Sequence, residues 1–464
     1  MKLRSERDSI GSMAVPEDAY YGVQTLRAVT NFPITGRRMC REMIVSLAQV
    51  KLAAALVHRE AGRVEPEAAH AIVAACREII AGGLMDAFIV DPIQGGAGTS
   101  ANMNMNEVVA NRAIELMGGR KGDYALVHPN DLVNMAQSTN DVFPTAGKLA
   151  ALKLLAPALD ALNELCAALE DKGEEFDDVI KMGRTQLQDA VPMNLGQSFR
   201  AWASAVRRDV ERLSVAGEGL LTINLGGTAI GTAVNTYPAY RARVIRKLSE
   251  ITGEPLVQAA DLMDATQNLD SYVNLSAALK TSAVNLSKIA NDLRLLSSGP
   301  RTGLGEINLP ARQNGSSIMP GKVNPVIPEV VSQVAFNIIG NDFTITMAAE
   351  AGQLELNAFE PVLFDNLFES LRTLTAACTT FRKNCIEGIT ANRERCRKLV
   401  MESTGVATAL CPYIGYQKAA ELAKKSLKTG VPLPKLALEE HIMNAEKLEK
   451  VLDPSAMTHP LAAD

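Results

Sequence analysis

The sequence predicts a mainly α-helical fold built around a long, central, up-and-down helix bundle. Two stretches place apolar residues three and four positions apart, the spacing of helices with one buried face. These are Leu152, Leu155, Leu159, Leu162, Cys166 and Leu169, and then Leu275, Leu279, Leu286, Ile289, Leu293 and Leu296 with Ser282 in the gap. Such seams favour nearly antiparallel packing at shallow angles. Core packing is the simplest role for both.

Three further helices are expected at about 191–216, 327–351 and 362–386, where apolar spacing continues without internal breakers. Pro157 is expected to kink the first seam helix. Turn residues and charge are richer towards both ends of the chain. We therefore expect a mainly helical N-terminal domain at 1–140, a central bundle domain at 141–390 and a small helical C-terminal domain at 391–464.

Composition excludes several classes of protein. The 464 residues include 47 basic and 52 acidic side chains, and a net charge of -5 offers no footprint for nucleic acid or an anionic membrane. No run is expected to approach the apolar length needed to span a bilayer, and the start of the chain is expected to lack the apolar segment of a secretory signal. The seven cysteines include no CxxC pair, which favours reduced thiols over disulfides or zinc. We expect a cytoplasmic protein that binds small molecules and no metal.

The run from Gly315 to Pro325 concentrates chemistry-bearing residues in a short loop. It combines hydroxyls, the Lys322 ammonium, the Asn324 carboxamide and two glycines, directly before an apolar helix. The N-terminus of a helix carries unpaired N–H groups and partial positive charge, so this position of the loop predicts a binding site for a carboxylate. A plain connector between helices also contains Gly, Ser and Pro. The combination of residues favours a mobile catalytic loop hinged at Gly315 and Gly321.

Three more clusters of small hydrogen-bonding residues lie far apart in the sequence. They are Thr99, the run Ser138, Thr139 and Asn140, and the pair Thr185 and Gln186. Hydroxyls, amides and backbone N–H groups hold a carboxylate by several hydrogen bonds. A single Ser or Thr is more often a helix cap, so only the combination indicates a site for a dicarboxylate.

The chain resembles the aspartase/fumarase superfamily in four segments, namely the run Gly315–Pro325, Gly95–Asn104, Gln137–Asp141 and Gly183–Asp189. The run Gly315–Pro325 is similar to the signature loop of that superfamily and is called the signature loop below. A weaker likeness lies at Thr458–Pro460. Members of this superfamily cleave C–N or C–O bonds and release fumarate. The resemblance implies a homotetramer whose central helices form one bundle and whose active sites each draw residues from three chains. No cofactor is implied. Long apolar helices with exposed surface are consistent with such association.

The resemblance also implies the role of each site residue. Ser316 is the catalytic base, assisted by Lys322 and by loop N–H groups that lower its pKa. The carboxylate next to the leaving group binds Thr185, Lys322 and Asn324. The carboxylate that becomes dianionic binds Thr99, Ser138 and Thr139, while Asn140, Thr99 and Gln186 face the leaving group.

Gln186 separates two reactions. Hydroxide benefits from an acid as it leaves, and fumarases usually carry histidine at this position, whereas ammonia departs from an already protonated amine. The sequence therefore favours elimination of ammonia from L-aspartate, with class II fumarate hydratase and a catalytically silent structural relative as alternatives. Glu329, the histidine's partner in a fumarase, is read as structural.

Four histidines and two motifs receive the simpler interpretation. His58, His70, His441 and His459 show no metal spacing and are expected on surfaces or at domain contacts. The His128–Asp131 segment is explained by a turn and helix cap, although it resembles a secondary anion site of fumarases. Gly226–Gly231 lacks the context of a phosphate loop, and the resemblance makes it a turn near the active site.

Overall fold

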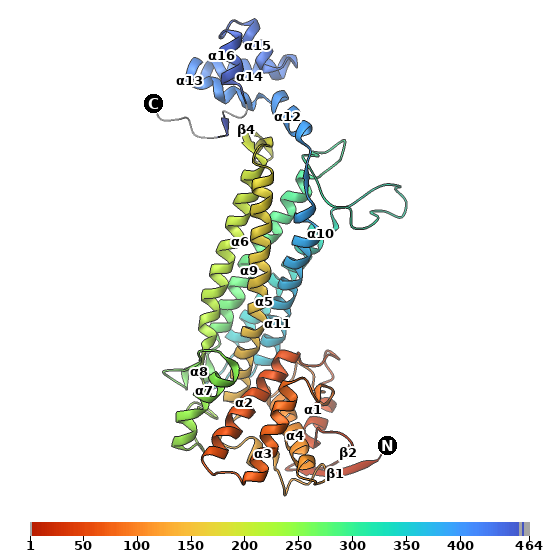
Figure 1. Cartoon of the computed structure of the whole chain (residues 1–464), viewed down its shortest axis with the longest axis vertical. Coiled ribbons are helices and arrows are strands. Elements are labelled where there is room, and N and C mark those ends of the chain that lie inside the picture. Colours follow the sequence, from red (N-terminus) through yellow and green to blue (C-terminus); the bar gives the residue numbers. More distant parts are fainter. Residues whose placement is uncertain (1, 454–456, 459–464) are drawn as a thin grey trace. The chain divides into compact units, whose positions relative to one another are not determined.

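The computed structural model describes residues 2–453, 457 and 458, and it is mainly helical, as predicted (Figure 1). The chain divides into two compact units, each assembled from three segments. Unit 1 comprises residues 1–159, 211–281 and 336–374, and unit 2 comprises 160–210, 282–335 and 375–464. The division into two units does not test the three expected domains, which remain a prediction.

Five long helices supply the bundle, and each contributes residues to both units. They are α5 (Thr139–Glu175), α6 (Leu195–Glu218), α9 (Asp270–Leu296), α10 (Val326–Glu350) and α11 (Glu360–Asn384). The expected ranges are confirmed to within a few residues. In α9 the whole apolar seam is buried, including Ser282, which is what a core-packing role requires.

Helix α5 corrects one expectation, because its length and composition alone would allow it to cross a membrane. Its most apolar window has a mean hydropathy of 1.3, and 67% of that window is buried inside the protein. Burial of this kind identifies the core helix of a bundle, so the apolar character serves packing. Pro144 and Pro157 both lie inside this helix.

Unit 1 contains shorter helices and helical turns, from the N-terminal segment and from residues 211–281. They are α1 (Val23–Asn31), α2 (Arg41–Glu60), α3 (Pro66–Ile80), η1 (Met85–Ala87), α4 (Thr99–Leu116), the π-helical turn η2 (Pro129–Val133), η3 (Gly219–Leu221), α7 (Pro238–Thr252) and α8 (Asp264–Gln267). Helix α2 is almost entirely buried and packs against α3 and α7. Strands β1 (Leu3–Asp8) and β2 (Gly11–Pro16) form an antiparallel hairpin, and β5 (Thr222–Ile223) pairs in parallel with β6 (Val257–Gln258).

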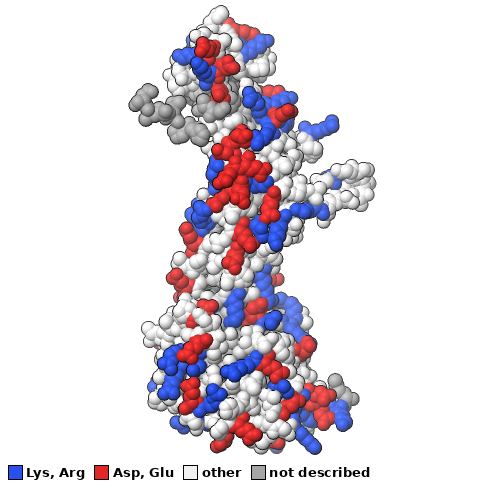
Figure 2. Space-filling view, viewed as in Figure 1, with Lys and Arg blue, Asp and Glu red and all other residues white. Residues whose placement is uncertain are grey.

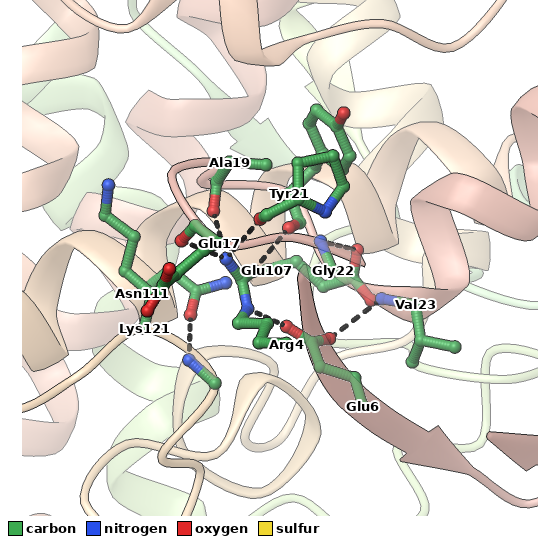
Figure 3. A network of polar contacts seen from close by, with 12 residues as sticks. Arg4, Glu6, Glu17, Ala19, Tyr21, Gly22, Val23, Glu107, Asn111 and Lys121 are labelled. Atoms are coloured by element: carbon green, nitrogen blue, oxygen red, sulfur yellow. Dashed lines mark hydrogen bonds and ion pairs between the residues drawn. The ribbon is translucent and has the colours of Figure 1, made fainter. Parts of the chain in front are cut away.

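A polar network fastens the N-terminal hairpin to α1 and α4 (Figure 3). The Arg4 guanidinium donates to Glu6 Oε1 at 2.7 Å and to four backbone carbonyls within residues 16–21 at 2.8–2.9 Å. The Glu107 carboxylate of α4 accepts three backbone N–H groups within residues 22–25, at 2.8–3.1 Å. Donors at the start of α1, which have no partner within the helix, are thereby satisfied.

Unit 2 carries a second hairpin and the C-terminal helices. Strands β3 (Ile180–Thr185) and β4 (Gln188–Asn194) are antiparallel, as are β7 (Ile307–Asn308) and β8 (Thr390–Ala391). The helices are η4 (Ile386–Gly388), α12 (Arg393–Glu402), η5 (Thr404–Leu410), α13 (Cys411–Ile414), α14 (Tyr416–Thr429), α15 (Leu433–Glu439) and α16 (Ala445–Val451). Their core is built on Val400, Leu410, Leu422 and Leu436, and it includes Met182 of β3.

Charged side chains of both signs mix on the face drawn in Figure 2, with an acidic group over the bundle helices. This face carries no continuous basic area, in agreement with the net charge of -5.

Candidate active site

Two helix N-termini lie side by side in unit 1. Helix α4 begins at Thr99 after Gly98, whose φ of 86° is left-handed. A Cβ added at Gly98 would lie 2.4 Å from the ring of Phe143, near the start of α5. Only glycine therefore permits both this backbone conformation and the close approach. The partial positive charges of two long helices meet here, and together they favour a bound anion.

Two hydroxyls at the start of α5 are oriented as donors. Ser138 Oγ accepts the backbone N–H of Asn140 at 3.2 Å, and Thr139 Oγ1 accepts the Asn102 side chain at 3.1 Å. Because each oxygen already accepts a hydrogen bond, its own O–H remains available to a ligand. Thr139 is buried, Ser138 is partly exposed and Thr99 is exposed at the first position of α4. The structure thus brings these predicted residues together at one place.

The turn at 226–231 contacts Asn140 through a hydrogen bond. The Asn140 side chain donates to Ala229 O at 2.7 Å, and the Asn224 side chain donates to Asn140 O at 3.0 Å. This contact agrees with the expectation that the glycine-rich turn lies beside the α5 cluster. Asp141 lies beneath both segments and accepts N–H groups from each. Burial raises the pKa of Asp141 to about 6, while its hydrogen bonds with backbone N–H groups oppose the shift.

A buried lysine supports the same cluster from below. Lys51 Nζ donates to Asn134 Oδ1 at 2.8 Å and to Gln137 Oε1 at 3.0 Å. Asn134 Oδ1 also accepts from Asn102 at 3.1 Å, which links the lysine to Thr139. Burial lowers the pKa of Lys51 to about 7, an effect that the Asp141 carboxylate opposes. Sequence reasoning missed Lys51, because a lysine within an apolar helix carries no motif.

Thr185 and Gln186 occupy the tip of the β3–β4 hairpin, which sequence reasoning did not anticipate. Gln186 and Leu187 form its two-residue turn, and their φ values are 55° and 61°. Positive φ at both turn positions matches a type I′ turn, which normally uses Asn or Gly. Both residues are exposed, so no packing forces this conformation. Backbone strain that packing does not impose is common at functional sites, so the tip is a candidate for one.

Buried charges anchor strand β3 of the hairpin. Arg184 Nη1 donates to Glu306 Oε1 at 2.9 Å, and Lys181 Nζ lies 3.7 Å from Glu306 Oε2. Glu306 is fully buried, and burial lowers the pKa of Lys181 while Glu306 opposes that change. A cavity of about 560 Å³ beside these residues is walled by α6 and α9. Strand β3 is therefore held by Glu306 on both sides of Met182 and Gly183, while the tip itself is exposed.

The signature loop is closed at its neck and exposed along its length. Gly315 N donates to Lys322 O at 2.8 Å, and the Asn324 side chain donates to Gly315 O at 2.7 Å. Ser316 Oγ accepts the N–H groups of Ile318 and Met319 at 3.1 and 3.0 Å. These donors stabilise negative charge on Oγ, and the same geometry is also that of an ordinary serine turn. Lys322 is exposed, and α10 begins two residues after Asn324.

The predicted site residues fall into two sets. Thr99, Ser138, Thr139 and Asn140 belong to unit 1, whereas Thr185, Gln186, Ser316, Lys322 and Asn324 belong to unit 2. Within unit 2, in the part of the chain that the structure describes, no hydrogen bond or ion pair joins the hairpin tip to the loop.

His58 corrects the expectation for the histidines. It is 1% exposed, with Nδ1 2.7 Å from Tyr237 Oη and Nε2 2.9 Å from Met135 O. Burial lowers its pKa to about 4. His70 and His441 are exposed, as expected, and His459 lies outside the described residues.

His128 has the simple role expected for it. His128 Nδ1 accepts the N–H groups of Asn130 and Asp131, which confirms the turn and cap. All seven cysteines are free. Over residues 2–453, 457 and 458, no group of three His, Cys, Asp or Glu side chains could hold a metal ion.

Long bundle helices with clustered hydroxyls, amides and helix N-termini define a helical-bundle protein with a candidate site for a small anion. A family model described as "Lyase" matches residues 11–340, and one described as "Fumarase C C-terminus" matches residues 406–459. The chain belongs to the aspartase/fumarase superfamily of lyases.

Full-length relatives support this assignment. Aspartate ammonia-lyases from Pseudomonas canavaninivorans and Bacillus subtilis (strain 168) are 54% and 51% identical, each over 99% of this chain and 97% of the relative. A crystal structure titled fumarate lyase:delta crystallin from Brucella melitensis bound to cobalt matches with a TM-score of 0.97 and 52% identity, covering 99% of this chain and 100% of that one. A class II fumarase from Schistosoma mansoni matches with a TM-score of 0.95 and 37% identity, at the same coverage.

Proposed function

We propose that the protein is an aspartate ammonia-lyase, which eliminates ammonia from L-aspartate to give fumarate. The single observation that carries this choice over a hydratase is Gln186 at the hairpin tip. A carboxamide cannot donate a proton as an acid, and an α-ammonium needs no such donor in order to leave as ammonia. The full-length relatives named aspartate ammonia-lyase support the same choice.

In this proposal the substrate is held by its two carboxylates. Thr185, Lys322 and Asn324 bind the carboxylate next to the ammonium. Thr99, Ser138 and Thr139 bind the other, which gains a second negative charge in the intermediate. The two hydroxyls available as donors and the paired N-termini of α4 and α5 support this assignment. Asn140, Thr99 and Gln186 face the ammonium.

Ser316 is the proposed base. Its alkoxide removes the proton from the carbon next to the dianionic carboxylate, the C–H electron pair enters that carboxylate as an aci-carboxylate, and ammonia leaves as the double bond forms. Two loop N–H groups already donate to Ser316 Oγ, which favours its anionic form. The Lys322 cation and the exclusion of water upon loop closure would favour it further. Each donor aimed at the dianion is typically worth about 3 kcal/mol.

We also propose a cytoplasmic homotetramer with shared active sites. One face of α10 exposes an apolar stripe of Phe336, Ile339, Phe343 and Met347, at helical spacing. A stripe of this size on a soluble chain marks an association surface. Packing of such stripes between subunits would bring the unit 1 set of one chain to the unit 2 set of another.

The test is to add purified protein to L-aspartate and to follow fumarate by ultraviolet absorbance together with released ammonia. We expect both products in equal amounts, and a loss of turnover of about 100- to 10,000-fold in Ser316→Ala with an unchanged thermal unfolding temperature. Ser317→Ala is the matched control, because it removes the exposed hydroxyl of the next residue and leaves Ser316 in place.

Other outcomes separate the alternatives. Fumarate from L-malate but not from L-aspartate would identify a fumarate hydratase. Silence with both substrates would leave a structural relative, and full turnover in Ser316→Ala would remove the proposed base.

A further inference from the structure

We propose that Asp141 is a positioning residue, which fixes the donors of the α5 start against the turn at 226–231 without touching the substrate. The inference rests on the proposed function, since those donors are the ones assigned to the dianionic carboxylate and the leaving group.

The evidence is the set of bonds that one carboxylate makes. Asp141 Oδ1 accepts the N–H of Ser138 at 2.9 Å, while Oδ2 accepts the N–H groups of Gly226 and Thr228 at 2.9 and 3.0 Å. The two segments are more than 80 residues apart in the sequence. Asp141 is 0% exposed, so a substrate cannot reach it. The side chain therefore holds two active-site segments together from behind.

Asn224 provides a second tie between the same segments. Its side chain donates to Asn140 O at 3.0 Å and to Thr266 Oγ1 at 3.1 Å, and it is also buried. Asn140 in turn donates to Ala229 O. The residue assigned to the leaving group is thus held through its own side chain and carbonyl and through its neighbour Asp141.

A carboxylate is the group that this position requires. Three N–H donors converge on its two oxygens, and an ionised carboxylate is an acceptor only. An asparagine of the same shape would direct an N–H towards at least one of those donors. One bond would be replaced by a repulsive contact, and the local backbone would shift. Lys51 and Tyr240 are titratable groups that interact electrostatically with Asp141: the Lys51 ammonium opposes the rise in the pKa of Asp141, and the Asp141 carboxylate helps to raise the pKa of Tyr240. Both remain in the variants below.

Such a shift affects the transition state more than the bound substrate. Donors aimed at developing charge act mainly as that charge appears, so a displaced donor lowers kcat while KM changes less. We expect kcat of Asp141→Asn to fall by about 100-fold and KM for L-aspartate to change by less than about 5-fold, since loss of one such donor typically costs this much.

Glu107→Gln is the matched control. Glu107 is likewise buried and accepts three backbone N–H groups, but these belong to the start of α1 (Figure 3). Both variants should unfold at a lower temperature. Only Asp141→Asn should lose kcat, and equal losses of kcat in the two variants would reduce Asp141 to a structural role and overturn the proposal.

A binding measurement distinguishes positioning from general damage. The nitronate dianion of 3-nitropropionate imitates the aci-carboxylate, whereas succinate imitates only the ground state. Calorimetry should show that Asp141→Asn weakens nitronate binding by about the same factor as kcat and leaves succinate binding within about 5-fold. Parallel weakening of both ligands, or of neither, would contradict the proposal.

Two provisions keep the outcome clear. If Asp141→Asn does not fold, Asp141→Glu keeps the charge but moves both oxygens by one methylene, and it should lower kcat and nitronate affinity together by about 10-fold, so unchanged values would overturn the proposal. If the unsubstituted protein releases no fumarate from L-aspartate, the proposed function has failed. The positioning role is then decided by the nitronate and succinate measurements alone.

Discussion

Gly315→Ala should open the neck of the signature loop without unfolding the protein. A Cβ at this position would lie 2.5 Å from Lys322 O and 3.0 Å from Asn324 N. Both are backbone atoms, so the neck itself must move. The change therefore displaces the segment that carries Ser316 and Lys322 while leaving both side chains intact.

The magnitude follows from the two bonds that close the neck. Gly315 N to Lys322 O and Asn324 Nδ2 to Gly315 O measure 2.8 and 2.7 Å. Each is worth about 0.5–1.5 kcal/mol net, so opening the neck costs the closed loop about 1–3 kcal/mol. If the closed neck is the active form, kcat falls roughly 5- to 150-fold at 25 °C. The loop is largely exposed, so the thermal unfolding temperature should stay the same.

Gly321→Ala is the comparison variant, because it alters a glycine of the same loop without a clash. Its φ of 78° is left-handed, yet an added Cβ meets nothing within 4 Å. Strain alone costs about 1 kcal/mol, or roughly a 5-fold loss of kcat. Steady-state release of fumarate from L-aspartate measures both variants. Wild-type turnover in Gly315→Ala, or a larger loss in Gly321→Ala, would refute the role of the neck.

Two further predictions concern stability and assembly. In the unfolded chain His58 is protonated below about pH 6.5, whereas in the folded protein it is protonated only below about pH 4. The neutral buried imidazole therefore makes its full contribution to the free energy of unfolding above about pH 6.5. About 3 kcal/mol of that free energy is lost as the pH falls to 4. Urea unfolding of His58→Gln at several pH values should show a smaller loss of stability over this range than the wild type, and parallel profiles would exclude the histidine. Phe343→Glu places a charge in the exposed α10 stripe, so light scattering should show loss of the tetramer and the assay a matching loss of activity; a fully active tetramer would show that the stripe is not the interface.

The bundle could be predicted because its signal is local. The seam from Leu275 to Leu296 repeats at the helical period, and every member is buried in α9. The start of α10 after Asn324 was equally readable, since proline and an apolar run follow. Periodicity therefore located the helices to within a few residues.

The roles of the buried polar residues and the β3–β4 hairpin could not be predicted, because they depend on partners that are distant in the sequence or on backbone strain. His58 has no unusual neighbours in the chain, yet Tyr237 and Met135 pair with both of its ring nitrogens. Asp141 follows a recognised run, but its role appears only where the amides of Gly226 and Thr228 reach it. The β3–β4 hairpin lacked the Asn-Gly signal that makes such turns readable. Long-range pairing and backbone strain leave no periodic trace.

The polar network around Arg4 and Glu107 also affects how the chain folds during synthesis. The hairpin that contains Arg4 is synthesised before α4, and the Glu107 carboxylate that secures the start of α1 follows it by about a hundred residues. Until then the amides at the start of α1 must rely on water. The start of α1 therefore lacks these partners during translation until α4 has been synthesised.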